Sequence, residues 1–146
     1  MKKKILIGIA VLLVVIQFVR IDKTVPESNP EDDIINMLQP SEKVATLLKS
    51  NCYDCHSNEV KYPWYSNIAP ISWVVEHHID EAREHLNFST WGSYDTKKQL
   101  HKLEESFEEM EEGEMPLTGY VKIHGELSEA DKELLEDWFL EASKGN

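Results

Sequence analysis

The chain has 146 residues, which is enough for one domain with a short appendage but not for two domains with separate cores. All 27 Asp and Glu residues follow residue 20, together with only 11 of the 15 Lys and Arg residues, and the formal net charge is −12. Such an acidic chain repels nucleic acid, so nucleic acid is excluded as an expected partner. A protein partner with a basic docking patch fits this charge, although an acidic excess also serves solubility alone.

The N-terminal segment is basic and then apolar. Residues 1–4 (MKKK) precede an apolar run over residues 5–19 (ILIGIAVLLVVIQFV). The run does not end in the small residues that a signal-peptide cleavage site needs, so we predict an uncleaved transmembrane signal anchor over residues 1–21. The positive-inside rule then gives a single-pass protein of the cytoplasmic membrane with its domain on the periplasmic side. Cleavage after export is the alternative.

The rest of the chain is expected to be a linker followed by a helical domain. Residues 22–40 contain three prolines and a cluster of charges, which predicts an extended linker. Over residues 41–144 the apolar residues recur at helical spacing, and no stretch alternates at period two over more than a few residues. Four helices are expected to begin at Ser41, Pro70, Asp95 and Ser128. The predicted fold class is therefore all-α, with the domain over residues 41–144.

The stretch Cys52-Tyr53-Asp54-Cys55-His56 has the most specific chemistry in the chain. These are the only two cysteines in the sequence, too few for a typical structural zinc site, and no strand precedes them as a thioredoxin-like dithiol requires. A structural disulfide would leave His56 without a role. On a helix both thiols face the same way and can form thioethers with the two vinyl groups of one haem, while His56 binds the iron. We predict one covalently attached haem c.

A second ligand would complete the coordination of the haem iron. Met115 follows His56 by 59 residues, in a loop before the last helix, and its thioether favours ferrous iron. Packing in the core is the alternative role for Met115. The alternative ligands are His78, on the apolar face of the second helix, and His124, close to Met115 in sequence.

Four sequence blocks resemble a known family: CYDCHSN, KYPWYSNIAPISW, REHLNFSTW, and GEMPL followed by Tyr120 and His124. They are similar to the cytochrome c-like haem-binding domain of small membrane-anchored or exported bacterial proteins, over about residues 41–140. The final helix (LSEADKELLEDWF) is also similar to class I cytochrome c, whereas a long aromatic-rich segment between residues 58 and 94 is not. The resemblance implies haem attachment at Cys52, Cys55 and His56, with Met115 as the other iron ligand.

The aromatic-rich segment supplies further candidates for the cofactor site. Trp64 and Tyr65 are expected to wall the porphyrin, and Arg83 is expected to pair with the haem propionates. Burial in an ordinary protein core is the alternative for the aromatic residues.

These features predict a monohaem c-type cytochrome that exchanges single electrons with a redox protein partner, and thus an electron carrier rather than an enzyme. The first alternative is a haem-based sensor or gas-binding module in which Met115 leaves the iron open. The second is a small peroxidase-like haem enzyme with His78 as its acid–base residue. The third is a disulfide-stapled interaction domain without haem.

Overall fold

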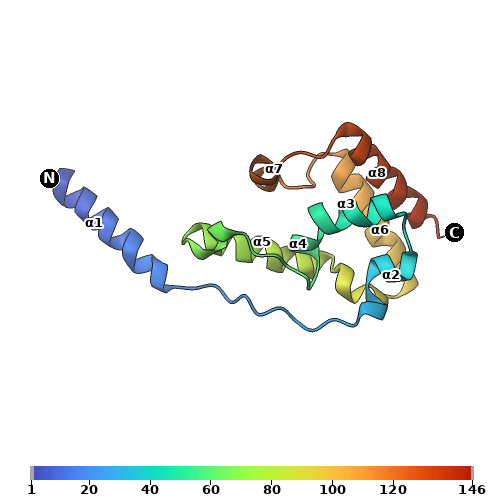
Figure 1. Cartoon of the computed structure of the whole chain (residues 1–146), viewed down its shortest axis with the longest axis horizontal. Helices are drawn as coiled ribbons and strands as arrows, with labels where there is room; N and C mark the ends of the chain where they lie inside the picture. The colour runs from blue at the N-terminus through green and yellow to red at the C-terminus, as the bar shows by residue number, and fades with distance from the viewer. Residues whose placement is uncertain (1, 146) are drawn as a thin grey trace.

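The computed structural model describes residues 2–145, and all regular secondary structure in that part of the chain is helical, which confirms the predicted all-α class. The α-helices are α1 (Lys2–Val15), α2 (Ile34–Leu38), α3 (Glu42–Asn51), α4 (Tyr53–His56), α5 (Ile71–His85), α6 (Thr96–Glu111), α7 (Thr118–His124) and α8 (Glu129–Ser143). The 3₁₀-helices are η1 (Ile16–Phe18), η2 (Pro30–Asp32), η3 (Trp64–Asn67) and η4 (Phe88–Ser93). Figure 1 shows α1 at one end of the molecule and the remaining helices gathered at the other.

Three of the predicted helices begin at a polar residue that caps the first turn: Ser41 before α3, Asp95 before α6 and Ser128 before α8. Each side-chain oxygen accepts a backbone N–H three residues further along the chain, at 3.3, 2.8 and 3.2 Å respectively. After α6, Gly113 has a φ of 77°, a conformation in which glycine avoids the steric penalty of other residues. These local signals account for the agreement between the predicted and observed helix positions.

The predicted transmembrane anchor over residues 1–21 is wrong. Among residues 2–145, no helix has both the length and the apolar character needed to cross a membrane. Helix α1 has 14 residues, which at 1.5 Å per residue gives a length of about 21 Å, whereas the hydrocarbon core of a bilayer is about 30 Å thick. The predicted localisation in the cytoplasmic membrane depended on this anchor and is corrected with it.

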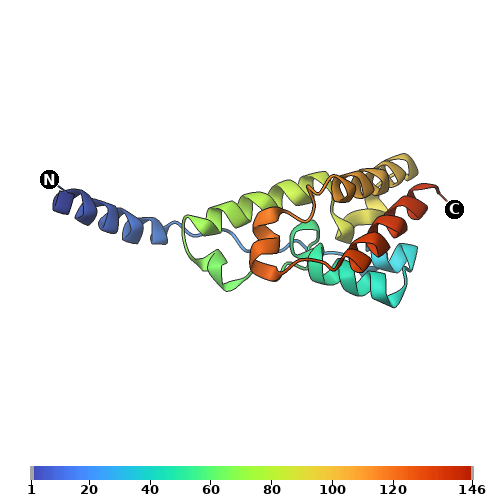
Figure 2. The ribbon, with the colours of Figure 1, turned by 90° about the horizontal axis from the view of Figure 1, so that it is seen from above.

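Polar contacts fasten the segment after α1 to the rest of the molecule. The Gln17 side chain donates to the carbonyl of Ala69 at 2.9 Å and accepts from the Ala69 N–H at 3.0 Å. The Arg20 guanidinium donates to the carbonyl of Asn67 at 2.8 Å, and Lys23 Nζ donates to Asn67 Oδ1 at 2.8 Å. Figure 2 shows the end of α1 close to η3 and the start of α5.

The second half of the predicted linker folds onto the domain. Ile34 is fully buried, and Asp33 and Tyr53 are 5% and 1% exposed. The Tyr53 hydroxyl donates to Asp33 Oδ1 at 2.8 Å, and the same oxygen caps α2 by accepting from the Ile35 N–H at 3.0 Å. Residues 30–38 therefore attach directly to the helix that carries Cys55 and His56. The expectation of an extended linker fits only the part before η2.

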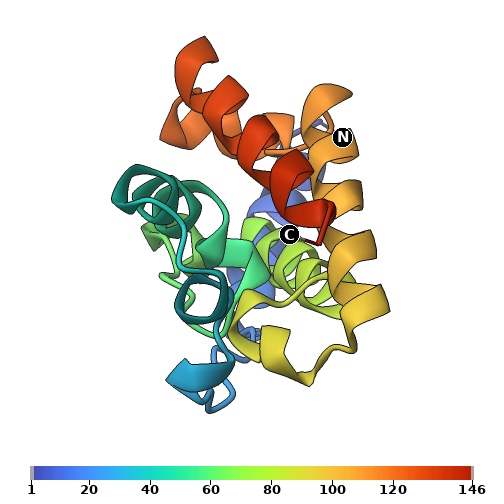
Figure 3. The same ribbon diagram turned by 90° about the vertical axis from the view of Figure 1, so that its right-hand side faces the viewer.

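The core lies where α3, α6, α8 and η4 meet. Helix α8 packs along α6, and α3 packs against α8; Figure 3 shows α8 and α6 on one side of the molecule and α3 on the other. The most deeply buried large residues are Ile34, Val44, Leu48, Tyr53, Phe88, Trp91, Leu103 and Leu135. A chain of 146 residues has a small core, so a cavity in this core is lined by residues from most of the surrounding helices.

Helix α5 joins the core only with its C-terminal half. Ile79 and Leu86 are 3% and 9% exposed, whereas Ile71 and Val74 are 48% and 52% exposed. The sequence predicts one apolar stripe along the whole helix, but neighbouring elements cover only part of it, because α5 extends past the packed helices (Figure 2). The covered half ends beside His56.

Candidate functional site

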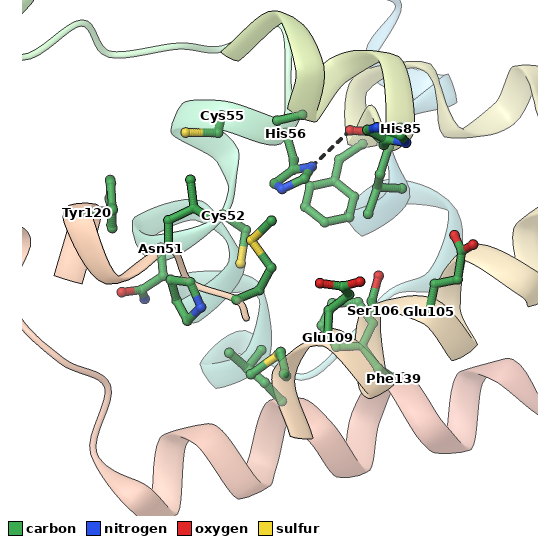
Figure 4. Close-up of a pocket in the computed structure, with 18 of the residues that line it drawn as sticks. Asn51, Cys52, Cys55, His56, His85, Glu105, Ser106, Glu109, Tyr120 and Phe139 are labelled. Carbon is green, nitrogen blue, oxygen red and sulfur yellow. Dashed lines mark hydrogen bonds between the residues drawn. The ribbon is translucent and has the colours of Figure 1, made fainter. Parts of the chain in front are cut away.

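A cavity of about 590 Å³ opens between α4, the end of α5, α6, α7 and α8 (Figure 4). Its volume lies in the range of about 300–1,000 Å³ that is typical of sites for cofactors and other small molecules. Most of its wall is apolar, formed by Ala82, Leu86, Phe88, Met110, Leu117, Leu127, Leu135 and Phe139. Such a wall favours a large apolar ligand, and the few polar groups around it decide the chemistry.

Cys52 and Cys55 both line this cavity. A single helical turn brings the two cysteines together, since the N–H of Cys55 and that of His56 both donate to the Cys52 carbonyl, at 3.2 and 2.9 Å. The two thiols are free, and burial raises the pKa of Cys52 to about 12 and that of Cys55 to about 11. At neutral pH both are therefore uncharged, which disfavours a reactive dithiol, because the thiolate is the nucleophile in disulfide exchange.

His56 also lines the cavity, and its ring orientation is fixed. His56 Nδ1 lies 3.1 Å from the carbonyl oxygen of Leu86. Because a carbonyl can only accept, Nδ1 carries the proton and Nε2 keeps a free lone pair. Burial lowers the pKa of His56, although the nearby carbonyls of Leu86 and Ala82 act in the opposite direction. A neutral imidazole with one nitrogen held by a backbone carbonyl is the usual form of a metal-binding histidine.

Met115 reaches the same cavity from the loop after α6. The N–H groups of Glu114 and Met115 both donate to the carbonyl of Glu109, at 2.9 and 3.0 Å, so the loop is clipped to the end of α6. The Met115 side chain is partly buried against the core. The structure thus brings together Cys52, Cys55, His56 and Met115, which are distant in sequence by up to 63 positions. His78 lines the cavity too, although it is exposed.

Four other predicted site residues, Trp64, Tyr65, Arg83 and His124, do not line the cavity, and the structure gives them other contacts or an exposed position. Trp64 is 75% exposed, on η3. The Tyr65 hydroxyl and His124 Nε2 share a hydrogen bond of 2.7 Å, which turns both side chains toward each other. Arg83 donates through Nε to the carbonyl of Ser57 at 2.9 Å, behind the turn that carries His56. Their roles as haem walls, propionate partner or alternative iron ligand stay predictions.

Helix α7 was not expected from the sequence, and it brings Tyr120 to the cavity. The Tyr120 ring stacks on His124 with centroids 4.2 Å apart, and its hydroxyl donates to the Ser50 carbonyl at 3.3 Å. Figure 4 shows Tyr120 on the same side of the cavity as Cys55. Burial raises the pKa of Tyr120 to about 12. Through the bond between Tyr65 and His124, α7 is held over the cysteine side of the site.

Polar residues from α5 and α6 form the other side of the cavity, and the sequence reading did not single them out as site residues. They are Glu81, His85, Lys102, Glu105, Ser106 and Glu109. Four of them follow helical spacing within α6, at positions i, i+3, i+4 and i+7, next to the apolar stripe of the same helix. This spacing is visible in the sequence and could have indicated these four residues. Without the fold, however, a polar stripe on a helix is interpreted as a face exposed to solvent.

The fold and the cavity define a small helical domain built to enclose an apolar cofactor with thiol, imidazole and thioether groups around it. Comparison with protein families identifies the cofactor class: residues 11–141 match the model of the haem-binding domain family. The match covers most of the chain, so the chain belongs to the haem-binding domain family. Searches of curated proteins and of solved structures gave no match.

The residues around the cavity fit a haem. Its apolar wall suits the porphyrin faces, and the free lone pair of His56 Nε2 and the Met115 thioether are ligands that haem iron takes in proteins. The partly buried, neutral thiols of Cys52 and Cys55 lie on the same side as Tyr120. The site therefore has groups that suit the porphyrin faces and the iron of the cofactor that the family name implies.

Proposed function

We propose that this protein is a monohaem c-type cytochrome that carries single electrons. The observation that carries the proposal is the convergence of Cys52, Cys55, His56 and Met115 on one apolar cavity. The family accounts for haem binding, and the two cysteines within one helical turn support covalent attachment in particular.

Covalent attachment needs two neutral thiols beside the vinyl groups of the cofactor. Each thiol would add across one vinyl C=C bond, so that a C–S bond would form and the thiol hydrogen would go to the other vinyl carbon. The addition consumes no oxidant or reductant. Burial, which raises the pKa of both Cys52 and Cys55, keeps the hydrogens on the sulfurs until then.

Haem bound here would supply an iron that alternates between the ferrous and ferric states. His56 would hold the iron through Nε2, because the Leu86 carbonyl fixes the opposite nitrogen. Met115 would hold it with a soft thioether that favours the ferrous form. Two permanent ligands in a largely apolar cavity would leave little to rearrange when an electron moves, which suits a carrier better than a catalyst.

The electron donor or acceptor is proposed to be another redox protein. The net charge of −12 favours a partner with a basic docking patch, because opposite charges steer the encounter of two proteins. Association with such a partner should weaken as ionic strength rises, owing to screening.

The proposal is tested by expressing the chain with cytochrome c maturation factors and measuring haem that stays attached under denaturing conditions. We expect one haem per chain in the parent protein and none in the Cys52→Ala, Cys55→Ala double variant. Absence of covalent haem in the parent protein would overturn c-type attachment.

Carbon monoxide distinguishes an electron carrier from a gas-binding module. The ferrous parent protein should bind it poorly, whereas Met115→Ala should bind it readily, because the iron loses one ligand. Met37→Ala is the matched control, since Met37 lies on α2, is 44% exposed and does not line the cavity. Ready binding by the parent protein would favour the gas-binding alternative. An unchanged Met115→Ala spectrum would exclude Met115 as a ligand and direct attention to His78.

A further inference from the structure

We propose that Lys102 and His85 bind the haem propionates, a role that neither the family assignment nor the sequence gives to them. The proposal rests on the proposed function, because covalent attachment at the cysteines fixes which edge of the porphyrin faces which wall. A haem carries its two vinyl groups toward one side of the ring and its two propionates toward another. Thioether bonds at Cys52 and Cys55 would therefore direct the propionates away from the cysteine side of the cavity.

The side of the cavity away from the cysteines is formed by the C-terminal end of α5 and by the stretch of α6 from Lys102 to Glu109. In Figure 4, Cys55 and Tyr120 lie on one side of His56, and His85 and Glu105 lie on the other. Lys102, which pairs with Glu105, lines the cavity as well. The propionate edge would accordingly face the polar wall, and the apolar body of the porphyrin would face the apolar wall.

Lys102 is the strongest anion-binding group on this wall. Among the described residues that line the cavity, it is the one Lys or Arg, and its side chain is only 16% exposed. Its ammonium group has three donors, of which Glu105 Oε2 takes one at 2.5 Å. Glu105 Oε1 also lies 3.1 Å from His101 Nε2, so the Glu105 carboxylate has a second partner besides Lys102. A mostly buried ammonium group with unused donors beside an apolar cavity is suited to a carboxylate of the ligand.

His85 supplies a second donor at the end of α5. An imidazole carries at least one N–H whether it is neutral or charged, so it can donate to a carboxylate in either state. Ser106, one turn after Lys102 on α6, also lines the cavity. Its hydroxyl already donates to the Lys102 carbonyl at 2.7 Å, so it can only accept further hydrogen bonds. The donors available on this wall are thus those of Lys102 and His85.

The carboxylates on the same wall make these donors necessary. Glu81, Glu105 and Glu109 line the cavity. Two propionates placed among them without a cation would meet like charges in a partly buried setting, which is unfavourable. Lys102 and His85 are the groups on the wall that can offset this repulsion.

Arg83, the propionate partner expected from the sequence, lies on the wrong side. Its Nε donates to the carbonyl of Ser57 at 2.9 Å, so its guanidinium is held beside the turn that carries Cys55 and His56. Its Nη2 atom is buried without a hydrogen-bond partner, but Arg83 does not line the cavity. Arg83→Gln therefore serves as a competing variant in the test.

The test is resonance Raman spectroscopy of the haem-loaded protein, in which the propionate bending band reports hydrogen bonding to the propionates. Lys102→Gln should move this band to lower frequency, because a charged donor is lost, and Lys102→Arg should restore it. Lys97→Gln, an exposed position on the same helix, removes the same charge and should leave the band unchanged. If Lys102→Gln does not fold, His85→Asn provides the same readout from the other donor.

The possible outcomes separate this proposal from the proposed function. A band that stays in place in both Lys102→Gln and His85→Asn overturns the propionate assignment and leaves covalent haem binding intact. A band that moves in Arg83→Gln alone overturns it in favour of Arg83. A chain that takes up no haem overturns both proposals at once.

Discussion

Replacing Tyr53 by Phe isolates a buried hydrogen bond that joins the cysteine-bearing helix to the N-terminal part of the chain. The Tyr53 hydroxyl lies 2.8 and 3.0 Å from the two carboxyl oxygens of Asp33, and both residues are buried. The hydroxyl has one proton, so these two distances describe one shared bond. Burial raises the pKa of Tyr53, with a further contribution from Asp33, so the hydroxyl stays protonated and donates.

The expected loss follows from the kind of bond. A hydrogen bond to a charged acceptor contributes about 1.5–3 kcal/mol, and its removal leaves the Asp33 carboxylate with one fewer partner in a buried place. The ring remains, so the stacking on Phe88, with centroids 5.4 Å apart, is kept. The N-cap bond from Ile35 to Asp33 also remains. We therefore expect Tyr53→Phe to lower the free energy of unfolding by about 2 kcal/mol.

Urea denaturation of the haem-free protein, followed by circular dichroism, measures this loss. With a slope of about 2 kcal/mol per molar urea, a change of about 2 kcal/mol lowers the midpoint by about 1 M. Tyr62→Phe is the matched control, because Tyr62 is not fully buried and its hydroxyl does not contact Asp33; its midpoint should change little. A loss below about 0.5 kcal/mol for Tyr53→Phe, at unchanged slope, would refute the reasoning.

Four further substitutions test the packing and the helix starts. Gly92→Ala should destabilise the protein by about 1–3 kcal/mol in the same urea assay, because a Cβ there would lie 2.6 Å from Asp32 Oδ1 and 3.1 Å from Asp32 Cα. Gly119→Ala has no heavy atom within 4 Å and should be neutral or stabilising, so equal losses would contradict the steric explanation. Asp95→Ala and Ser128→Ala should each cost about 0.5–2 kcal/mol through loss of a helix cap, and an unchanged midpoint would show that the cap is dispensable.

The sequence predicts well those features that are encoded within one or two helical turns. The caps at Ser41, Asp95 and Ser128 need only a polar side chain and an N–H three residues on, so they are readable without the fold. The pairing of Cys52 with Cys55 and His56 follows from helical spacing alone. The all-α class follows from the same periodicity repeated along the chain.

Features that depend on meetings between distant segments were predicted less well. Arg83 was assigned to the propionates because it is one of the cations nearest the motif-rich region in sequence, but in the folded chain its Nε donates to the Ser57 carbonyl and it does not line the cavity. Ile34 looked like part of a linker, and it is fully buried. The length of α1 was overestimated because apolar composition continues to Val19 while the α-helix ends at Val15. Composition does not record where a helix stops.

By itself, the sequence determined the helical class, the helix starts and the local arrangement of two thiols and an imidazole, because each depends on residues a few positions apart. Only the tertiary structure decided which distant side chains share the cavity with them. Packing of α6 and α8 brings Met115 and Lys102 to its wall, and Tyr65 and His124, which bond to each other, do not line it. Contacts across many residues depend on how helices stack, and that is a property of the whole fold rather than of any one segment.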